Sequence, residues 1–268
     1  MHRKRIKLEP DSNVEDGFYQ DKAEAVKMYL REEITVDEAA RAVTTPIEYS
    51  DNPEQDLERL WDFLVDSLMG LSSNYTNPLI ELLRAIDGLP ELEITAVKEN
   101  KLPFDGKLWR GLPGFADCYA KARESDWYEL AIKADSLERS RLRDNHVKKA
   151  AIEAVLVVLG IGGIPIDWGY ETVADALEYS NALLDFQVPA AAEWLKIAGR
   201  RFREGAAKEE HSWAFNRQRD LLDAGNLMTL DRYLFWRKRL DDIRSQSEAT
   251  VEAATAAVER IERELLGV

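Results

Sequence analysis

Cysteine is nearly absent from this sequence, since Cys118 is the only one among 268 residues. One thiol cannot close a disulfide within the chain, so a disulfide-stabilised secreted scaffold is excluded and a reducing compartment is indicated. The basic residues 1–7 are followed by no apolar stretch of the kind that a secretory signal needs. We therefore expect a cytoplasmic protein, with nuclear import through the basic N-terminus as the alternative.

Long apolar runs are also missing. The longest, residues 154–166, is shorter than the roughly 20 residues that span a bilayer, and glycines and Pro165 interrupt it. The sequence therefore predicts no membrane association.

Positive charge is in deficit, with 36 Lys and Arg against 50 Asp and Glu and a net charge of -14 at pH 7. An acidic surface repels a phosphate backbone, so nucleic acid is disfavoured as a partner. Hydrophobic residues make up 45% of the chain, which is enough for a substantial core and excludes an acidic disordered chain.

Residues that bind metals or activate nucleophiles are sparse. The three histidines are scattered, and no two have a familiar ligand spacing, so we expect no metal and no cofactor. The glycine-rich residues 160–165 lack the last glycine of a dinucleotide-binding fingerprint and are interpreted as a helix end followed by a tight loop. Cys118 is expected to be a small core residue rather than a reactive thiol.

Helical periodicity, in contrast, runs through most of the chain. Residues 53–71 place apolar side chains at intervals of three and four after Pro53, a favourable first helical residue. Thr35 and Glu38 have the spacing of a capping box, which marks another helix start. The sequence predicts an all-α fold of stacked antiparallel helix pairs, as an irregular bundle or a short solenoid, with a long C-terminal helix.

The C-terminal segment is expected to be that long helix. From Thr229 to Leu266 no proline or glycine interrupts about 37 residues, and apolar residues near the end form a heptad seam. The seam either covers helices of its own chain or forms a homodimer through residues 246–268. The predicted organisation is a disordered basic tail (1–19), a single helical domain (20–245) and an extension of the last helix (246–268).

Three aromatic motifs carry a family resemblance. They are LWRGLPGF at residues 108–115, WLKIAG at 194–199 and FWRKRL at 235–240. Together with an opening segment at 35–46, they resemble an all-helical family of filamentous fungi that is catalogued only as a domain of unknown function. The resemblance covers most of residues 20–245 and implies a fungal, intracellular, helical protein, but no reaction.

The same motifs place indole rings near guanidinium groups. Such neighbours can line a pocket for an aromatic or anionic small molecule, or each tryptophan can fill a helix interface while the arginine stacks on it. The candidate ligand-binding residues are Trp109, Arg110, Phe115, Trp194, Arg200, Trp236 and Arg237. The loop around Trp109 is the favoured functional edge, because its prolines and glycines hold it out of a helix.

Two functions are favoured over a third, a nuclear regulatory partner, which only the basic N-terminus suggests. The leading hypothesis is a binding or scaffold protein that uses a groove between helices to hold a small molecule or a protein partner. The alternative is a cofactor-independent enzyme that acts on a small secondary metabolite in an aromatic-lined pocket, where a histidine or an acidic residue transfers the proton.

Overall fold

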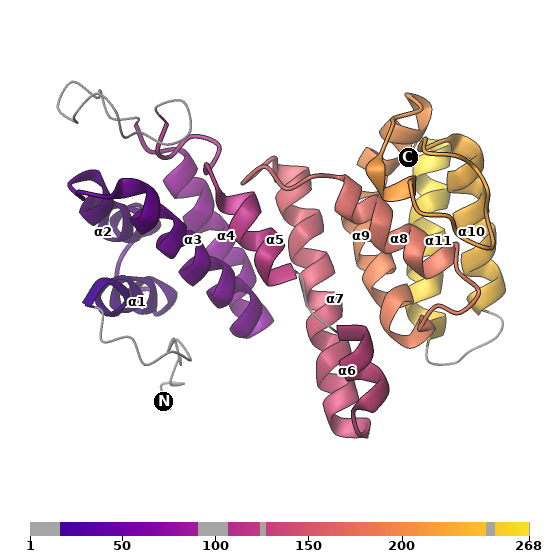
Figure 1. Cartoon of the computed structure of the whole chain (residues 1–268), viewed down its shortest axis with the longest axis horizontal. Coiled ribbons are helices and arrows are strands. Elements are labelled where there is room, and N and C mark those ends of the chain that lie inside the picture. The colour runs from indigo at the N-terminus through magenta and orange to yellow at the C-terminus, as the bar shows by residue number, and fades with distance from the viewer. Residues whose placement is uncertain (1–16, 91–106, 124–126, 245–249, 268) are drawn as a thin grey trace. The chain divides into compact units, whose positions relative to one another are not determined.

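A computed structural model of the chain describes residues 17–90, 107–123, 127–244 and 250–267. Within these ranges the regular elements are all helices, which confirms the all-α prediction (Figure 1). The chain forms two compact units: unit 1 consists of residues 1–125 and 161–163, and unit 2 of residues 126–160 and 164–268. The single domain expected over 20–245 stays a prediction, and the basic tail lies almost wholly outside the described residues. Among those that are described, no helix is long and apolar enough to cross a membrane.

The described part of unit 1 contains the first five α-helices and one short 3-10 helix. They are α1 (Gly17–Leu30), α2 (Val36–Glu48), α3 (Pro53–Gly70), η1 (Ser73–Tyr75), α4 (Thr76–Asp87) and α5 (Phe115–Arg123). Helix α2 packs against α1 and α4, and α3 packs against α4 and α5. The stacked helix pairs expected from the sequence are therefore present in this unit.

The starts of α2 and α3 follow the predicted signals. The Thr35 hydroxyl accepts a hydrogen bond from the Glu38 amide at 3.2 Å, and the Glu38 carboxylate accepts one from the Thr35 amide at 2.7 Å. This reciprocal pair satisfies two amides that the helix itself leaves free, so the capping box is confirmed. Pro53 is the first residue of α3, as its fixed φ favours.

The described part of unit 2 contains six further α-helices and one short 3-10 helix. They are α6 (Trp127–Lys133), α7 (Ser136–Leu159), α8 (Asp167–Leu177), α9 (Leu184–Ala207), η3 (Trp213–Phe215), α10 (Leu230–Arg244) and α11 (Val251–Leu266). Helix α9, which has 24 residues, contacts α7, α8, α10 and α11 and so forms the centre of this unit.

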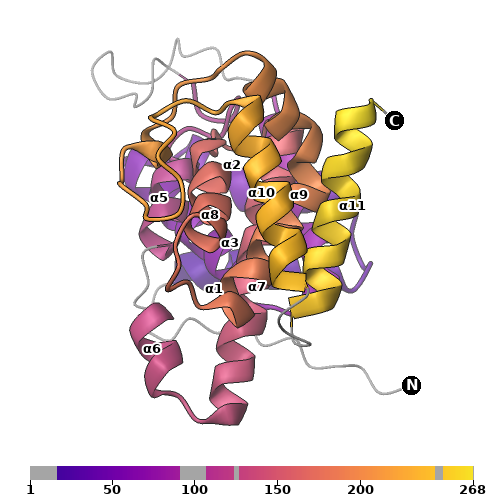
Figure 2. The same ribbon diagram turned by 90° about the vertical axis from the view of Figure 1, so that its right-hand side faces the viewer.

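The C-terminal segment corrects one prediction, because residues 229–266 do not form a single helix. Helix α10 ends at Arg244, α11 begins at Val251, and the two lie side by side (Figure 2). Because the chain folds back, both helices bury an apolar face. The free energy gained from this burial exceeds what a single continuous helix extending into solvent would gain from its additional backbone hydrogen bonds. The predicted seam of α11 packs on α9 and α10 of its own chain, so the homodimer through 246–268 stays a prediction.

Close packing in unit 2 depends on a glycine of α8. An added Cβ on Gly169 would lie 2.6 Å from the Trp194 ring and 3.0 Å from the Phe202 ring. Both rings are fully buried, so they have little room to move aside. Glycine at this position therefore sets how closely α8 approaches α9.

We predict that Gly169→Ala lowers the free energy of unfolding by about 1–3 kcal/mol, because the added methyl group overpacks this contact. Gly70→Ala is the matched control, since nothing lies within 4 Å of a Cβ at the end of α3. Urea denaturation followed by circular dichroism measures both variants. Equal stability of the two variants would show that α8 and α9 do not approach this closely.

Candidate functional site

The predicted tryptophans lie in the core rather than on a surface. Trp109, Trp194 and Trp236 each have 0% of their surface exposed. Trp109 belongs to unit 1, whereas the other two belong to unit 2, where both pack against Phe202. Burial favours the structural interpretation of these residues, and their role in ligand binding stays a prediction.

The arginines of the same motifs lie further out than the tryptophans. Arg110 is exposed, and Arg200 is 81% exposed with its guanidinium 3.0 Å from Glu204 one turn away. Arg237 is partly exposed and donates to Glu262 of α11. Arg237 directly follows the buried Trp236 on α10, and successive helix residues point about 100° apart, so its side chain projects away from the Trp236 ring.

Trp236 is instead part of a buried ionic network that sequence reasoning missed. Its Nε1 donates to Glu178 Oε1 at 2.7 Å, and Arg232 Nε donates to the same oxygen at 3.0 Å. A second guanidinium, that of Arg219, lies 4.0 Å from the other oxygen, and these three charged side chains are only 1–2% exposed. No local pattern could reveal this network, because Glu178 and Arg232 are 54 residues apart.

The network holds the segment between α9 and α10 in place. Arg232 donates to the carbonyls of Gly225 and Leu227, and Arg219 donates to the carbonyl of Ala214. The Leu221 amide in turn donates to the backbone oxygen of Glu178. Arg219 also pairs with the partly exposed Asp175 at 2.6 Å. Since Glu178, Arg219 and Arg232 all have partners and are closed to solvent, we interpret this network as structural.

Burial is costly for the central carboxylate. Desolvation raises the pKa of Glu178 even though two guanidinium groups and the Trp236 indole favour its ionised form. The cost of removing the charge from water therefore exceeds the attraction to its partners, as is common for buried ion pairs.

A solvent-accessible cavity lies elsewhere, in unit 1 between α3 and α5. Its volume is about 270 Å³. The residues that line it are Glu54, Leu57, Glu58, Trp61, Pro113, Gly114, Asp117, Cys118 and Lys121. The apolar side chains are buried and form the floor, while the charged ones are exposed and form the rim.

The loop that was predicted as a functional edge forms one wall of this cavity. Trp61 Nε1 donates to the Pro113 carbonyl at 2.7 Å, and the Trp61 ring meets Phe115 edge-on at 5.8 Å. Gly111 and Gly114 adopt positive φ values of 80° and 78°, which glycine tolerates and other residues rarely adopt. The loop therefore contributes Pro113 and Gly114 to the cavity, while its tryptophan points into the core.

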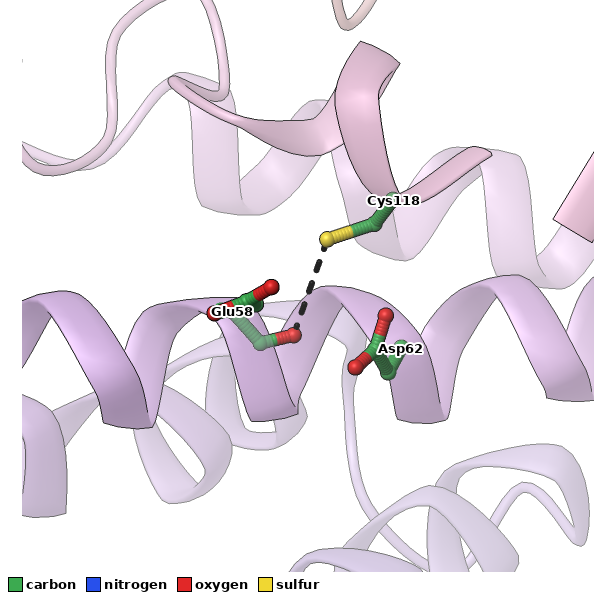
Figure 3. A group of neighbouring side chains, drawn as sticks. All are labelled: Glu58, Asp62 and Cys118. Carbon is green, nitrogen blue, oxygen red and sulfur yellow. Dashed lines mark hydrogen bonds between the residues drawn. The ribbon is translucent and has the colours of Figure 1, made fainter. Parts of the chain in front are cut away.

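Three potential ligand groups meet at the edge of the cavity (Figure 3). A carboxylate oxygen of Glu58, one of Asp62 and the sulfur of Cys118 lie within 4.8 Å of one another. The Cys118 thiol donates to the backbone oxygen of Glu58 at 3.8 Å, and Lys121 Nζ lies 2.6 Å from the Glu58 carboxylate. In the described part of the chain, this trio could hold a metal ion, although the sequence indicated none.

Comparison with known proteins gives a family. Residues 61–240 match the model of DUF3632, described as a protein of unknown function. The chain belongs to the DUF3632 family. No curated protein and no solved structure matches it. The match contains all three aromatic motifs but begins after the segment at 35–46, and the fungal origin implied by the resemblance stays a prediction.

The thiol of this DUF3632 protein is poorly suited to act as a nucleophile. Burial and the negative charge of Asp62 raise the pKa of Cys118 to about 12. Because this pKa lies well above neutral pH and the thiolate is the reactive form, Cys118 is expected to be a weak nucleophile near pH 7. The i, i+4 spacing of Glu58 and Asp62 is a signal that the sequence did offer, but nothing local linked it to a cysteine 60 residues further on.

We predict that iodoacetamide alkylates Cys118 of the folded protein at pH 8 roughly a hundredfold more slowly than a free thiol. A pKa near 12 leaves very little thiolate, and the higher nucleophilicity of that thiolate offsets only part of the loss. Mass spectrometry measures the rate without ambiguity, because the chain has one cysteine. Asp62→Asn is expected to accelerate the reaction, and alkylation at the free-thiol rate without denaturant would contradict the prediction.

We also predict that Arg232→Met lowers the free energy of unfolding by about 3–5 kcal/mol, because it leaves the Glu178 carboxylate buried without its closest cation. Arg200→Met is the matched control: it removes an exposed ion pair on α9 and is expected to cost less than about 1 kcal/mol. Denaturant unfolding compares the two variants, and similar losses for both would show that the network is not needed for stability.

Proposed function

We propose that this DUF3632 protein is a binding protein and that the cavity between α3 and α5 is its ligand site. The observation that carries the proposal is the combination of a buried apolar floor with an exposed charged rim around about 270 Å³. That volume is close to the lower end of the range for small-molecule sites, which are mostly apolar with a few polar groups that fix orientation.

The rim favours a ligand that carries positive charge. Glu54, Glu58 and Asp117 contribute three carboxylates, against the one ammonium group of Lys121. The Lys121 ammonium nitrogen already lies 2.6 Å from a carboxylate oxygen of Glu58, so this carboxylate is accessible to a cation. An ammonium group on a small apolar body would satisfy the rim while its body packs on Leu57 and Trp61.

A binding role has more support than an enzymatic one. The raised pKa of Cys118 argues against a cysteine nucleophile in this cavity, since the thiolate is the reactive form. A groove between helices is also the feature that the leading hypothesis from the sequence requires. The cavity between α3 and α5 has the form of such a groove, and its lining contains none of the three tryptophans that the sequence pointed to.

Titration with benzylamine, using benzyl alcohol as its uncharged counterpart, tests the proposal. The reporter is the indole N–H signal of Trp61 in a proton–nitrogen correlation spectrum, assigned with a Trp61→Phe variant. We expect benzylamine to shift this signal with roughly millimolar affinity, and the alcohol to bind at least about tenfold more weakly.

Glu58→Gln is expected to abolish the advantage of the amine over the alcohol, because it removes the carboxylate that pairs with the ammonium group. Glu138→Gln is the matched control, since this exposed glutamate on α7 pairs with Arg141 in unit 2. If neither probe shifts the Trp61 signal at tens of millimolar, the cavity is not a ligand site. Equal affinity for both probes would exclude the preference for positive charge.

A further inference from the structure

We infer that Glu58, Asp62 and Cys118, at the edge of this cavity, also hold a thiophilic divalent metal ion such as Zn²⁺. The inference rests on the proposed function, which makes the α3–α5 cavity a cation site, and it adds a metal ion to the ammonium ligands that the rim accepts.

The backbone already places the three donors around one point. Glu58 and Asp62 are four residues apart on α3 and so project from the same face, and Cys118 approaches them from α5. Their ligand atoms lie within 4.8 Å of one another. Tetrahedral zinc with bonds of about 2.0–2.3 Å needs donors roughly 3.3–3.8 Å apart. Side-chain rotations that move the carboxylate oxygens by about 1 Å would bring the three donors to this spacing.

The cavity is an independent observation that points to a bound ligand. Two of the three donors, Glu58 and Cys118, line it, so a metal ion held by the trio would lie beside about 270 Å³ of accessible space. Three protein donors with one open position are typical of metal sites that bind an exchangeable water or ligand, whereas structural zinc sites have four protein donors.

The donor set selects the kind of metal. A thiolate is a soft ligand that favours zinc and its neighbours in the transition series, whereas Mg²⁺ and Ca²⁺ require six or more oxygen donors. Two carboxylates and one thiolate carry three negative charges, which attract a divalent ion strongly. On binding, the S–H bond of Cys118 breaks, its proton passes to solvent and a sulfur–metal bond forms.

Lys121 is the competitor in this arrangement. Its ammonium group lies 2.6 Å from Glu58 and must leave that oxygen before the metal can bind there. Its side chain is 65% exposed and therefore free to swing into solvent. Replacing this lysine with an uncharged residue of similar shape would raise cation affinity slightly at any acidic surface, because it removes a repelling charge. Direct competition predicts a larger gain, and one that requires Glu58.

Titration of the full chain with Co²⁺, followed by displacement with Zn²⁺, tests the inference. Tetrahedral cobalt bound to a thiolate gives intense visible bands and a near-ultraviolet charge-transfer band, and with one cysteine in the chain the latter reports Cys118 alone. We expect both signals, and we expect stoichiometric Zn²⁺ to remove them while excess Mg²⁺ does not.

The variants separate the contribution of each donor. Cys118→Ser is expected to abolish the charge-transfer band, Asp62→Asn to weaken Co²⁺ binding at least tenfold, and Lys121→Met to strengthen it severalfold. The gain from Lys121→Met is expected to vanish when it is combined with Glu58→Gln. Lys133→Met, which removes an exposed lysine paired with Glu129 in unit 2, is the matched control and is expected to change nothing. Circular dichroism checks that each variant folds.

Two results would overturn the inference: no charge-transfer band at millimolar Co²⁺, or unchanged metal affinity in Cys118→Ser. The benzylamine titration of the metal-free chain keeps the two proposals apart. A shift of the Trp61 signal by benzylamine without cobalt bands rejects the metal and retains the cation site, whereas failure of both probes rejects both.

Discussion

One hydrogen bond in unit 1, from the Trp61 indole to the Pro113 carbonyl, determines where α5 can begin. The Trp61 Nε1 to Pro113 oxygen distance is 2.7 Å, so this bond fixes the end of the loop to α3. Phe115, two residues later, packs edge-on against the same indole. Three residues later Cys118 faces α3, because one helical turn separates it from Phe115. The cavity, its charged rim and the cluster at its edge all follow from this attachment of α5 to α3.

The buried cluster around Glu178 and the open cluster at the α3–α5 cavity differ in how their charges are balanced. Glu178 in unit 2 is surrounded by Arg219, Arg232 and the Trp236 indole, so the carboxylate there has all its partners and no access to solvent. At the α3–α5 cavity, carboxylates outnumber the single ammonium group of Lys121 and open onto accessible space. A saturated, buried cluster fixes conformation, whereas an open cluster with surplus charge can accept a ligand.

Local features of the sequence predicted local structure well. The capping box at Thr35 and the start of α3 at Pro53 depend on residues within one helical turn of each other, and both are confirmed. The break between α10 and α11 was missed, because no proline or glycine marks it and its cause is the burial of both helices against α9. Periodicity reports which face of a helix is apolar but not whether the chain turns back to use it.

The sequence pointed to only one wall of the candidate site, the loop around Trp109, which contributes Pro113 and Gly114. Tryptophan and arginine stood out in an acidic sequence, but the tryptophans of the motifs are core residues. Trp109 anchors its loop in the core, and the Trp236 indole donates a hydrogen bond to the buried Glu178. Most of the polar groups at the cavity are common residues, because glutamate and aspartate are abundant, and the single cysteine, Cys118, is remote from Glu58 and Asp62 along the chain. The rare large side chains were the best guide to how the helices pack, since burying them stabilises the fold. The chemistry of the site instead depends on which common polar groups that packing leaves facing an open space, and this only the tertiary structure determines.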